Sequence, residues 1–306
     1  MKLRAVTQGA VISVIAPASF AQPDRVERGM AALRALGFEP KFGDHALKRG
    51  PLYFAGTPSQ RLADLYAAFE DENTEAVMCL RGGYGSNYLL NGLDVARIAP
   101  HPKPFFAYSD LTGMQLHLLK EIGLTAFHGP MVAADFYQED GVHLESFQAA
   151  LKGNAYSVGT EEGLRPLRDG AASGTLYGGC LSILVALLGT PWEPQTEGKL
   201  LFLEDVDTKP YQVDRMLWQL RHAGKLEGVR GIIFGEMLHC MSPGAAPTLL
   251  DEAILSALDG WNGPIAIGLR SGHVSRQNVT LRFGVDAELT VGTEVRLDLS
   301  EPAKTA

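Results

Sequence analysis

The chain has 306 residues, of which 46% are hydrophobic and 20% charged, a composition typical of soluble proteins with one large or two medium domains. Its formal net charge of −8 gives no basis for binding nucleic acid or an anionic membrane, so neither is expected as a partner. The cysteines Cys79, Cys180 and Cys240 are far apart, which argues against a disulfide scaffold or a structural zinc site and indicates a reducing compartment.

The N-terminal segment has two early basic residues followed by a short apolar run over residues 10–16. The run contains several β-branched residues and ends at Pro17, so it predicts a buried first strand rather than a signal peptide. No apolar run in the sequence approaches the roughly 18 residues that are needed to cross a bilayer. We therefore expect a cytoplasmic protein without a membrane partner.

Strand and helix patterns alternate through the first half of the chain. Apolar runs without a helical period predict strands at 10–16, 76–80, 105–108 and 124–127. Helices are predicted from Pro23 to Gly37, after a capping box at 57–60, after Ser109, and over 144–151. Such alternation predicts an α/β fold with a mostly parallel sheet flanked by helices, whose ligands bind beyond the carboxyl ends of the strands.

The character of the sequence changes at about residue 154, where glycine and charged residues become frequent. We predict an N-terminal domain over residues 1–153, a linker over 154–172 and a second domain over 173–306. The second domain is predicted to mix helices at 181–188, from Pro210 and over 248–258 with strands at 200–203, 231–234, 264–267, 279–283, 288–291 and 295–299.

Ser109 lies where the apolar run 105–108 gives way to a helical pattern, in which Leu111, Met114 and Leu118 recur. A serine at a strand-to-helix corner exposes its hydroxyl, and the backbone N–H groups at the helix N-terminus can hold an oxyanion. Serine is also a favoured helix N-cap, and caps are far more common than nucleophiles. The local sequence alone leaves both interpretations open.

A glycine-rich turn, Arg81-Gly82-Gly83-Tyr84-Gly85-Ser86, follows the strand predicted at 76–80. Glycines let backbone N–H groups approach a ligand closely, although the turn lacks the lysine of a phosphate-binding loop. Because the turn follows a strand, it is expected at the same sheet edge as Ser109. The pattern fits a ligand-binding turn and a plain turn equally well.

A serine nucleophile needs a base, and the base needs an orienting carboxylate. Of the eight histidines, His128 and His239 follow predicted strands, and His273 lies in a turn with two glycines. A lone histidine is more often structural than catalytic. Glu204 ends the apolar run 200–203, where a carboxylate needs a partner, although it also fits a capping or solvated edge acid.

Ser109, Glu204 and His273 together would supply a nucleophile, a carboxylate and a base. They come from both halves of the chain. An active site built from them would lie between the two predicted domains, which is a common position for a cleft.

Eight short motifs are distributed over nearly the whole chain. They are Ile15-Ala16-Pro17-Ala18-Ser19, Phe54-Ala55-Gly56-Thr57, Arg81-Gly82-Gly83-Tyr84-Gly85, Tyr108-Ser109-Asp110-Leu111-Thr112, His128-Gly129-Pro130-Met131, Gly189-Thr190-Pro191-Trp192, Leu203-Glu204-Asp205 with Asp214-Arg215-Met216-Leu217, and Gly268 to His273. In these motifs the sequence resembles the LD-carboxypeptidases (murein tetrapeptide carboxypeptidases) and the related microcin C immunity peptidases. Each motif alone is weak, but all eight in the family's order are highly specific.

The resemblance implies an α/β N-terminal domain that carries the serine and a β-rich C-terminal domain that carries the glutamate and the histidine. It implies a serine peptidase with a Ser-His-Glu triad. By position in the motifs, Ser109 matches the nucleophile, His273 the base and Glu204 the acid. The active site is then expected between the domains.

The resemblance also implies an oxyanion hole and a place for the substrate. The expected oxyanion donors are the backbone N–H groups of Asp110 and Gly83. Arg81, Gly82 and Tyr84 are candidates for binding the substrate, with Arg81 as a clamp for its terminal carboxylate. The structural alternative for Arg81 is a salt bridge at the sheet edge. Neither a cofactor nor a metal is expected.

The implied activity is removal of the terminal D-alanine from a murein tetrapeptide during peptidoglycan recycling in the cytoplasm. The expected partner is a muropeptide, and a homodimer is expected because relatives are often dimers. Cys180 stands where the family usually has asparagine. This departure affects no triad residue, but the local contact is expected to differ.

Two other functions remain open. A microcin C-type immunity peptidase would cleave aminoacyl nucleotides, and such proteins usually carry an aromatic loop inserted ahead of the glutamate. The compact stretch between Gly189 and Glu204 favours the carboxypeptidase. A non-catalytic module that binds a muropeptide is the third possibility, and the presence of all three triad residue types argues against it.

Overall fold

The computed structural model describes residues 3–241 and 244–301, and they divide into two compact units. The first unit contains the chain up to Asn154 together with Arg276–Gly284, and the second contains Ala155–Ser275 and Val285–Ser300. The first continuous stretch of the first unit thus runs to Asn154. The segment Arg276–Gly284, expected in the second domain, belongs to the first unit instead.

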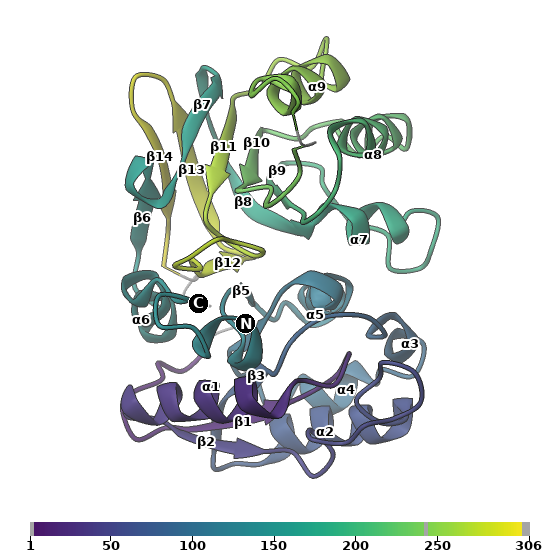
Figure 1. Cartoon of the computed structure of the whole chain (residues 1–306), viewed down its shortest axis with the longest axis vertical. Helices are drawn as coiled ribbons and strands as arrows, with labels where there is room; N and C mark the ends of the chain where they lie inside the picture. The colour runs from purple at the N-terminus through teal and green to yellow at the C-terminus, as the bar shows by residue number, and fades with distance from the viewer. Residues whose placement is uncertain (1–2, 242–243, 302–306) are drawn as a thin grey trace. The chain divides into compact units, whose positions relative to one another are not determined.

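Six strands form the sheet of the first unit, in the order β12-β5-β4-β3-β1-β2 (Figure 1). Their bounds are β1 Val11–Ile15, β2 Glu39–Phe42, β3 Thr74–Cys79, β4 Phe105–Ala107, β5 Ala126–His128 and β12 Leu281–Phe283. Every pairing is parallel except that of β12 with β5, which confirms the prediction of a mostly parallel sheet. β2 was not predicted because it lies at the sheet edge with mostly exposed residues, so it has no apolar pattern.

The strand β12 explains why the boundary near the C-terminus differs from the prediction. It pairs antiparallel with β5, with Leu281 opposite His128, and all three of its residues are buried. The apolar pattern of residues 279–283 indicates a buried strand. It carries no information about which sheet the strand joins, because that depends on the partner strand.

The first unit also contains six α-helices among its described residues, with one 3₁₀ turn and one π-helical turn. Their bounds are α1 Pro23–Ala35, α2 Pro58–Glu70, α3 Asn87–Leu90, α4 Val95–Ile98, η1 Ser109–Leu111, α5 Thr112–Ile122, η2 Val132–Phe136 and α6 Leu144–Lys152. Proline occupies the start of α1 and α2, where a missing N–H costs nothing. α5 and α6 end at Gly123 and Gly153 in the left-handed conformation that glycine adopts without strain.

The N-terminus of α2 carries the predicted capping box. The Oγ1 atom of Thr57 accepts a hydrogen bond from the Gln60 N–H at 3.3 Å, and the Gln60 Oε1 atom accepts one from the Thr57 N–H at 3.0 Å. Thr57→Ala is expected to lower the free energy of unfolding by about 1 kcal/mol, because one helix-end N–H loses its acceptor. Chemical denaturation measures this effect. Thr57→Ser retains the acceptor, so equal losses in the two variants would contradict the capping role.

Eight strands form the sheet of the second unit, in the order β6-β14-β13-β8-β9-β10-β11-β7 (Figure 1). Their bounds are β6 Tyr156–Gly159, β7 Arg165–Arg168, β8 Gly170–Cys180, β9 Lys199–Glu204, β10 Gly231–Gly235, β11 Ile265–Leu269, β13 Asp286–Val291 and β14 Val295–Leu299. The four strands β8 to β11 run parallel, and the outer strands pair antiparallel. The second unit is therefore β-rich, as the resemblance implied.

The stretch predicted as a linker, residues 154–172, differs in the structure. It contains β6, β7 and the start of β8, all of which belong to the eight-stranded sheet. β8 begins with glycine, alanine and serine residues, which have low strand propensity. β8 pairs with β13, with Thr175 opposite Asp286, and β13 lies more than one hundred positions further along the chain. The local composition of this stretch is therefore that of a linker, although pairing with a distant segment makes β8 a strand.

Three α-helices complete the described part of the second unit. They are α7 Leu181–Ala186, α8 Pro210–His222 and α9 Leu249–Ala257. α8 buries Val213, Leu217 and Leu220 on its apolar face, as its periodicity predicts. α9 begins after Thr248, close to the start of the helix predicted over 248–258, and the Thr248 side chain makes no capping hydrogen bond.

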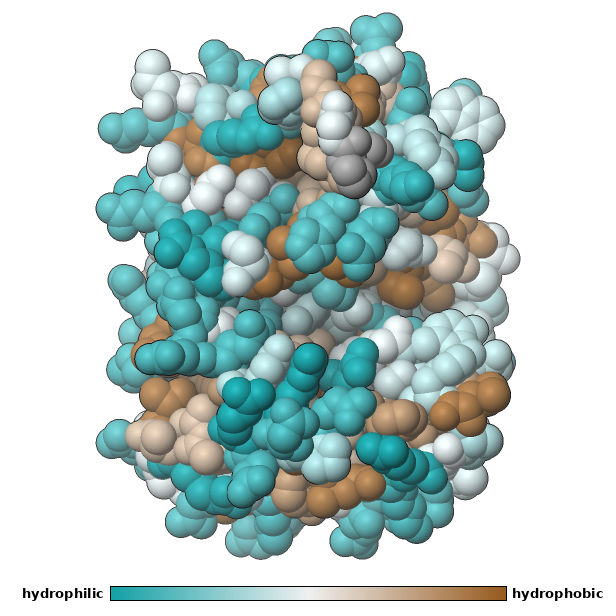
Figure 2. Space-filling view, in the orientation of Figure 1, coloured by the Kyte–Doolittle hydropathy of each residue, from teal (hydrophilic) through white to brown (hydrophobic). Residues whose placement is uncertain are grey.

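Apolar side chains are concentrated in the interior of each unit. Figure 2 shows a face on which hydrophilic residues predominate and hydrophobic ones are scattered, the usual surface of a globular protein. Among residues 3–241 and 244–301, no helix combines the length and the apolar character that crossing a bilayer requires.

Candidate active site

Ser109 occupies a strained corner between β4 and the helical segment that follows. β4 ends at Ala107, and the 3₁₀ turn η1 starts at Ser109 and leads into α5. The φ angle of Ser109 is +66°, in the left-handed region that non-glycine residues rarely adopt. Such strain costs about 1–3 kcal/mol and is concentrated at functional sites. A sharp strand-to-helix turn with a strained serine is the geometry by which hydrolases present a nucleophile.

The N-cap interpretation of Ser109 does not fit this geometry. Tyr108 holds the N-cap position of η1, and Leu111 holds that of α5. Neither cap makes a side-chain hydrogen bond. The hydroxyl of Ser109 is half-buried and makes no capping bond to a described residue, so it is available for chemistry.

The glycine-rich turn after β3 lies directly against Ser109. A Cβ atom placed on Gly82 would lie 2.8 Å from the Ser109 Cβ, 3.0 Å from its Oγ and 3.4 Å from the Asp110 nitrogen. No side chain fits there, so glycine permits the close approach. The backbone around Gly82 therefore borders both the hydroxyl oxygen and the N–H group that the resemblance assigns to oxyanion binding.

Hydrogen bonds hold the glycine turn to the Ser109 corner on one side and to the loop after β1 on the other. The Ser86 N–H donates to the Asp110 carboxylate at 2.8 Å, and the Ser86 hydroxyl donates to the Asp110 carbonyl at 2.6 Å. On the other side, the Ser19 Oγ accepts from the Tyr84 N–H at 3.1 Å, and the Ser19 N–H donates to the Gly82 carbonyl at 3.3 Å. Ser86, Asp110 and Ser19 are all buried, so this clamp is shielded from water.

The predicted substrate-binding residues lie at the same turn. Arg81 is half-buried, and it makes no ion pair within the described part of the chain, so the salt-bridge alternative is not observed. Tyr84 is 40% exposed and contacts Tyr53 and Tyr88 edge-to-face, with ring centroids at 5.4 Å and 6.0 Å. The turn thus carries a guanidinium and an aromatic ring close in sequence to Gly82, whose backbone borders Ser109.

Glu204 and His273 form a close pair in the second unit. Glu204 is the last residue of β9 and is fully buried, and His273 lies in the turn after β11. The Glu204 Oε2 atom is 2.7 Å from the His273 Nδ1 and accepts the His273 backbone N–H at 3.0 Å. Because a carboxylate only accepts hydrogen bonds, Nδ1 carries the proton in this pair. The other ring nitrogen, Nε2, is then the basic one.

Two glycines allow the backbone to close around the Glu204 carboxylate. A Cβ atom on Gly272 would lie 2.6 Å from the Glu204 Cδ, and Gly272 has φ +88°. A Cβ atom on Gly235, at the end of β10, would lie 2.6 Å from the Glu204 Cβ. Substituting either glycine would push the carboxylate away from His273. The tight turn therefore sets the geometry of the Glu204–His273 pair.

Cys180 stands next to Glu204 in the sheet, since the two residues are opposite each other in the β8–β9 register. Its Sγ atom lies 3.3 Å from the Ser182 Oγ and 3.9 Å from the Asp205 carboxylate. Burial, with the charges of Glu204 and Asp205, raises the pKa of the Cys180 thiol well above its usual value. The thiol is therefore neutral and unreactive, and acts as a small buried group.

The other two candidate histidines occupy different environments. His128 is fully buried at the end of β5, where its ring contacts Tyr108 and Phe283. His239 is exposed, and its Nδ1 lies 3.3 Å from the Asp207 carboxylate. His273 thus has a fully buried carboxylate partner at hydrogen-bond distance, whereas the carboxylate beside His239 is exposed.

A buried polar group near Ser109 was not predicted from the sequence. The Asp135 carboxylate, in η2, accepts from the Tyr108 hydroxyl at 3.3 Å, the Asn278 amide at 3.0 Å and the Met131 N–H at 2.8 Å. It links the residue before Ser109 to the segment that carries β12. The only signal in the sequence was an acidic residue inside the apolar stretch 131–136.

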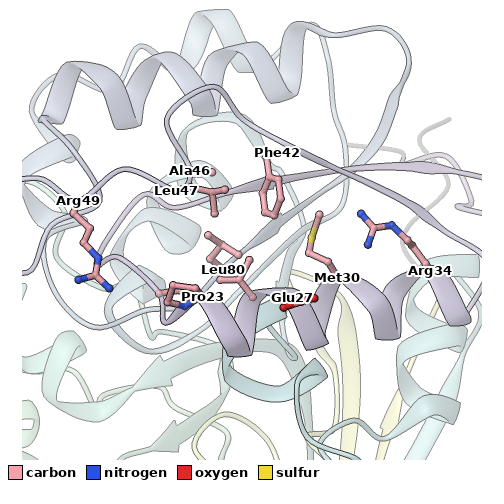
Figure 3. Close-up of a pocket in the computed structure, with 11 residues that line it drawn as sticks. Pro23, Glu27, Met30, Arg34, Phe42, Ala46, Leu47, Arg49 and Leu80 are labelled. Carbon is pink, nitrogen blue, oxygen red and sulfur yellow. The ribbon is translucent and has the colours of Figure 1, made fainter.

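A cavity of about 360 Å³ lies elsewhere on the first unit (Figure 3). Met30, Phe42 and Leu47 gather at its centre, and Arg34 and Arg49 lie at opposite ends. None of the predicted site residues lines it. The cavity is therefore separate from the Ser109 corner.

Most of the chain matches models of a known protein family. The family model described as the LD-carboxypeptidase N-terminal domain matches residues 12–129, and the one described as the LD-carboxypeptidase C-terminal domain matches residues 173–289. The first match contains Ser109 and the glycine turn, and the second contains Glu204 and His273.

Individual proteins give the same result. A probable murein peptide carboxypeptidase of Bacillus subtilis (strain 168) is 39% identical over 295 residues, covering 94% of this chain and 91% of the relative. The crystal structure of muramoyltetrapeptide carboxypeptidase from Oxalobacter formigenes is 29% identical with a TM-score of 0.84, covering 96% of this chain and 100% of that one. The crystal structure of an MccF-like protein from Bacillus anthracis str. Ames is 26% identical with a TM-score of 0.89, covering 98% of this chain and 99% of that one.

Proposed function

This chain belongs to the LD-carboxypeptidase family, and we propose that it removes the terminal D-alanine from murein tetrapeptides by a Ser-His-Glu mechanism. The observations that carry the proposal are a strained serine, Ser109, in the first unit and a buried carboxylate–imidazole pair, Glu204 and His273, in the second. These are the three functional groups that a serine hydrolase requires.

The mechanism follows from the roles of these groups. The Ser109 Oγ attacks the carbonyl of the L-configured centre of diaminopimelate, while the His273 Nε2 takes the hydroxyl proton. The N–H groups of Asp110 and Gly83 stabilise the oxyanion that forms. The imidazolium then donates its proton to the nitrogen of the leaving D-alanine, and Glu204 stabilises the imidazolium. Water, deprotonated by His273, hydrolyses the acyl-enzyme and restores Ser109.

The short covalent connection between His273 and the first unit supports the proposal that His273 acts as the base for Ser109. Arg276, which belongs to the first unit, follows His273 by three residues. An extended chain spans at most about 3.6 Å per residue, so the Cα atoms of His273 and Arg276 lie within about 11 Å of each other in any arrangement of the units. Asn278 then bonds to Asp135, which bonds to Tyr108, the neighbour of Ser109.

An exopeptidase must also bind the free carboxylate of its substrate. Arg81 precedes the glycine turn and has no described ion-pair partner, so its guanidinium is available to pair with a carboxylate. We include Arg81 in the proposal as the group that binds the D-alanine carboxylate, with Gly82 and Tyr84 lining the same place.

A second candidate function is cleavage of an aminoacyl nucleotide. It is favoured by the similarity to the MccF-like protein of Bacillus anthracis. The relatives named as murein peptide or muramoyltetrapeptide carboxypeptidases favour the first function. The two functions share the same nucleophile and base, so they differ only in the substrate that is accepted.

Mass spectrometry of murein tetrapeptide incubated with the protein tests the proposal. Loss of one alanine, absent in a parallel reaction with Ser109→Ala, would support both the activity and the nucleophile. An unchanged tetrapeptide with folded wild-type protein would overturn the proposed substrate. In that case, an aminoacyl sulfamoyl adenosine and an aminoacyl adenylate would be tested next, as a binding probe and a substrate.

The biological setting is part of the same proposal. A role in peptidoglycan recycling in the cytoplasm is consistent with three cysteines that are all buried and unpaired as disulfides. The homodimer remains a prediction from the resemblance, and sedimentation or light scattering of the purified chain would test it.

A further inference from the structure

Arg61 is a buried cation that touches the glycine turn. It lies in the first turn of α2 and is only 2% exposed, which is rare for arginine. Its Nη1 atom donates to the Pro17 carbonyl and to the Gly85 carbonyl, both at 2.8 Å. One guanidinium nitrogen thus joins the loop after β1 to the turn after β3.

The remaining contacts of Arg61 do not explain its burial as a source of stability. Its guanidinium lies over the Phe54 ring, 5.0 Å from the centroid, and its Nε and Nη2 atoms make no hydrogen bond to any described residue. Burial lowers the pKa of Arg61, and the neighbouring Asp110 carboxylate opposes this shift. Burying donor atoms without acceptors costs free energy, which offsets part of what the two Nη1 hydrogen bonds contribute. The burial of Arg61 therefore points to a role beyond net stability.

We propose that Arg61 is a positioning residue that holds the glycine turn in the geometry required for oxyanion binding beside Ser109. Its contact with Gly85 is two residues from Gly83, the proposed donor. No side chain fits at Gly85, because a Cβ atom there would lie 2.4 Å from the Phe54 ring. The inference rests on the proposed catalytic role of Ser109.

Arg61 works together with the contacts on the other sides of the turn. Ser86 ties its end to Asp110, and Ser19 ties its middle to the loop after β1. Arg61, from the first turn of α2, joins the same two loops through Pro17 and Gly85. Without it, the turn keeps its hydrogen bonds to Ser19 and Ser86, so the fold survives while the donor position relaxes.

The test compares Arg61→Met, Arg61→Lys and a control, Arg97→Met. Arg97 also lies over an aromatic ring, that of Tyr66, and pairs with Glu70 on the exposed surface, away from the glycine turn. A misplacement of about 1 Å in an active site can cost about 100-fold in rate. We expect Arg61→Met to lower kcat on murein tetrapeptide by about 100-fold with KM nearly unchanged, because the oxyanion forms only in the transition state.

Two readouts separate positioning from a general structural role. Arg61→Met is expected to lower Tm by only a few degrees, because the Pro17 and Gly85 carbonyls lose one donor while the other contacts of the turn remain. Arg61→Lys, whose ammonium can donate to both carbonyls, is expected to recover part of the lost kcat. Arg97→Met is expected to keep the wild-type kcat. Unchanged kcat in Arg61→Met would overturn the inference, as would parallel losses of kcat and Tm in both Arg61 variants.

A second probe distinguishes failure of this inference from failure of the proposed substrate. A fluorophosphonate labels an active serine when Oγ bonds to phosphorus, fluoride leaves and the hydroxyl proton passes to the base, with the developing charge on the phosphoryl oxygen. We expect labelling of Ser109, read by mass spectrometry, to slow by about 100-fold in Arg61→Met. Slower labelling would support the inference even if the tetrapeptide is not cleaved. Equal rates in wild type and Arg61→Met, or no label on Ser109, would overturn it.

Discussion

Ser109→Ala is expected to lower the turnover of murein tetrapeptide by about a millionfold, because loss of a triad nucleophile removes the contribution of the whole triad. Steady-state hydrolysis followed by mass spectrometry measures the effect. The remaining rate would come from the oxyanion donors and from binding alone. Binding of the tetrapeptide itself is expected to persist, since Arg81 and the glycine turn are unchanged.

Ser256→Ala is the matched control, because Ser256 is an exposed serine of α9. It is expected to leave turnover unchanged. Wild-type turnover in Ser109→Ala would contradict the assignment of the nucleophile. If Ser256→Ala lost turnover as Ser109→Ala does, the losses would point to impaired folding and not to a missing nucleophile.

The strain at Ser109 predicts a difference between two inactive variants. Alanine at φ +66° is strained as serine is, whereas glycine is not. Ser109→Gly is therefore expected to exceed Ser109→Ala in free energy of unfolding by about 1 kcal/mol, with both inactive. Equal stabilities would contradict stored strain at this corner.

Glu204→Gln is expected to lower kcat by about 10⁴-fold while the chain stays folded. Removing the charge of the equivalent carboxylate in a serine triad has an effect of this size, because the imidazole takes the wrong tautomer. In this protein, one oxygen, the Glu204 Oε2, contacts both the His273 backbone N–H at 3.0 Å and the His273 Nδ1 at 2.7 Å. An amide NH₂ in that place would face Nδ1 as a donor, so the ring proton would move to Nε2 and leave no base. An amide oxygen in that place would keep both contacts but would lack the charge that stabilises the imidazolium.

The control for this variant is Glu193→Gln, since Glu193 pairs with Lys225 near the surface of the second unit. It is expected to retain wild-type kcat. Steady-state assays at a saturating concentration of tetrapeptide measure the kcat of both variants. A Glu204→Gln enzyme with wild-type kcat would show that His273 does not depend on this carboxylate, and the triad assignment would fail.

Much of the first unit could be predicted because its signals are local. The capping box at Thr57 acts within one helical turn, and the structure contains it. The change from an apolar run to a helical period located the corner at Ser109 in the same way. The end of a buried strand similarly pointed to Glu204, which is fully buried.

Features that depend on distant residues were not predictable in this way. β8 looked like part of a linker because its small residues gain strand structure only by pairing with β13 and β9. The pairing of Asp135 with Asn278 joins residues 143 positions apart. Arg61 fitted an ordinary polar position of an amphipathic helix, and nothing nearby in the sequence indicates that two backbone carbonyls bury it.

The sequence by itself determined the alternation of strands and helices, the corner that holds Ser109, and the residue types available for catalysis, because hydrophobic period and turn chemistry act over a few residues. Only the tertiary structure decided that Ser109 is strained, that His273 is the histidine paired with Glu204, and that Arg61 joins two loops at the glycine turn. Each of these features depends on segments that packing brings together. Because the segments are far apart in the sequence, no local pattern predicts their contact.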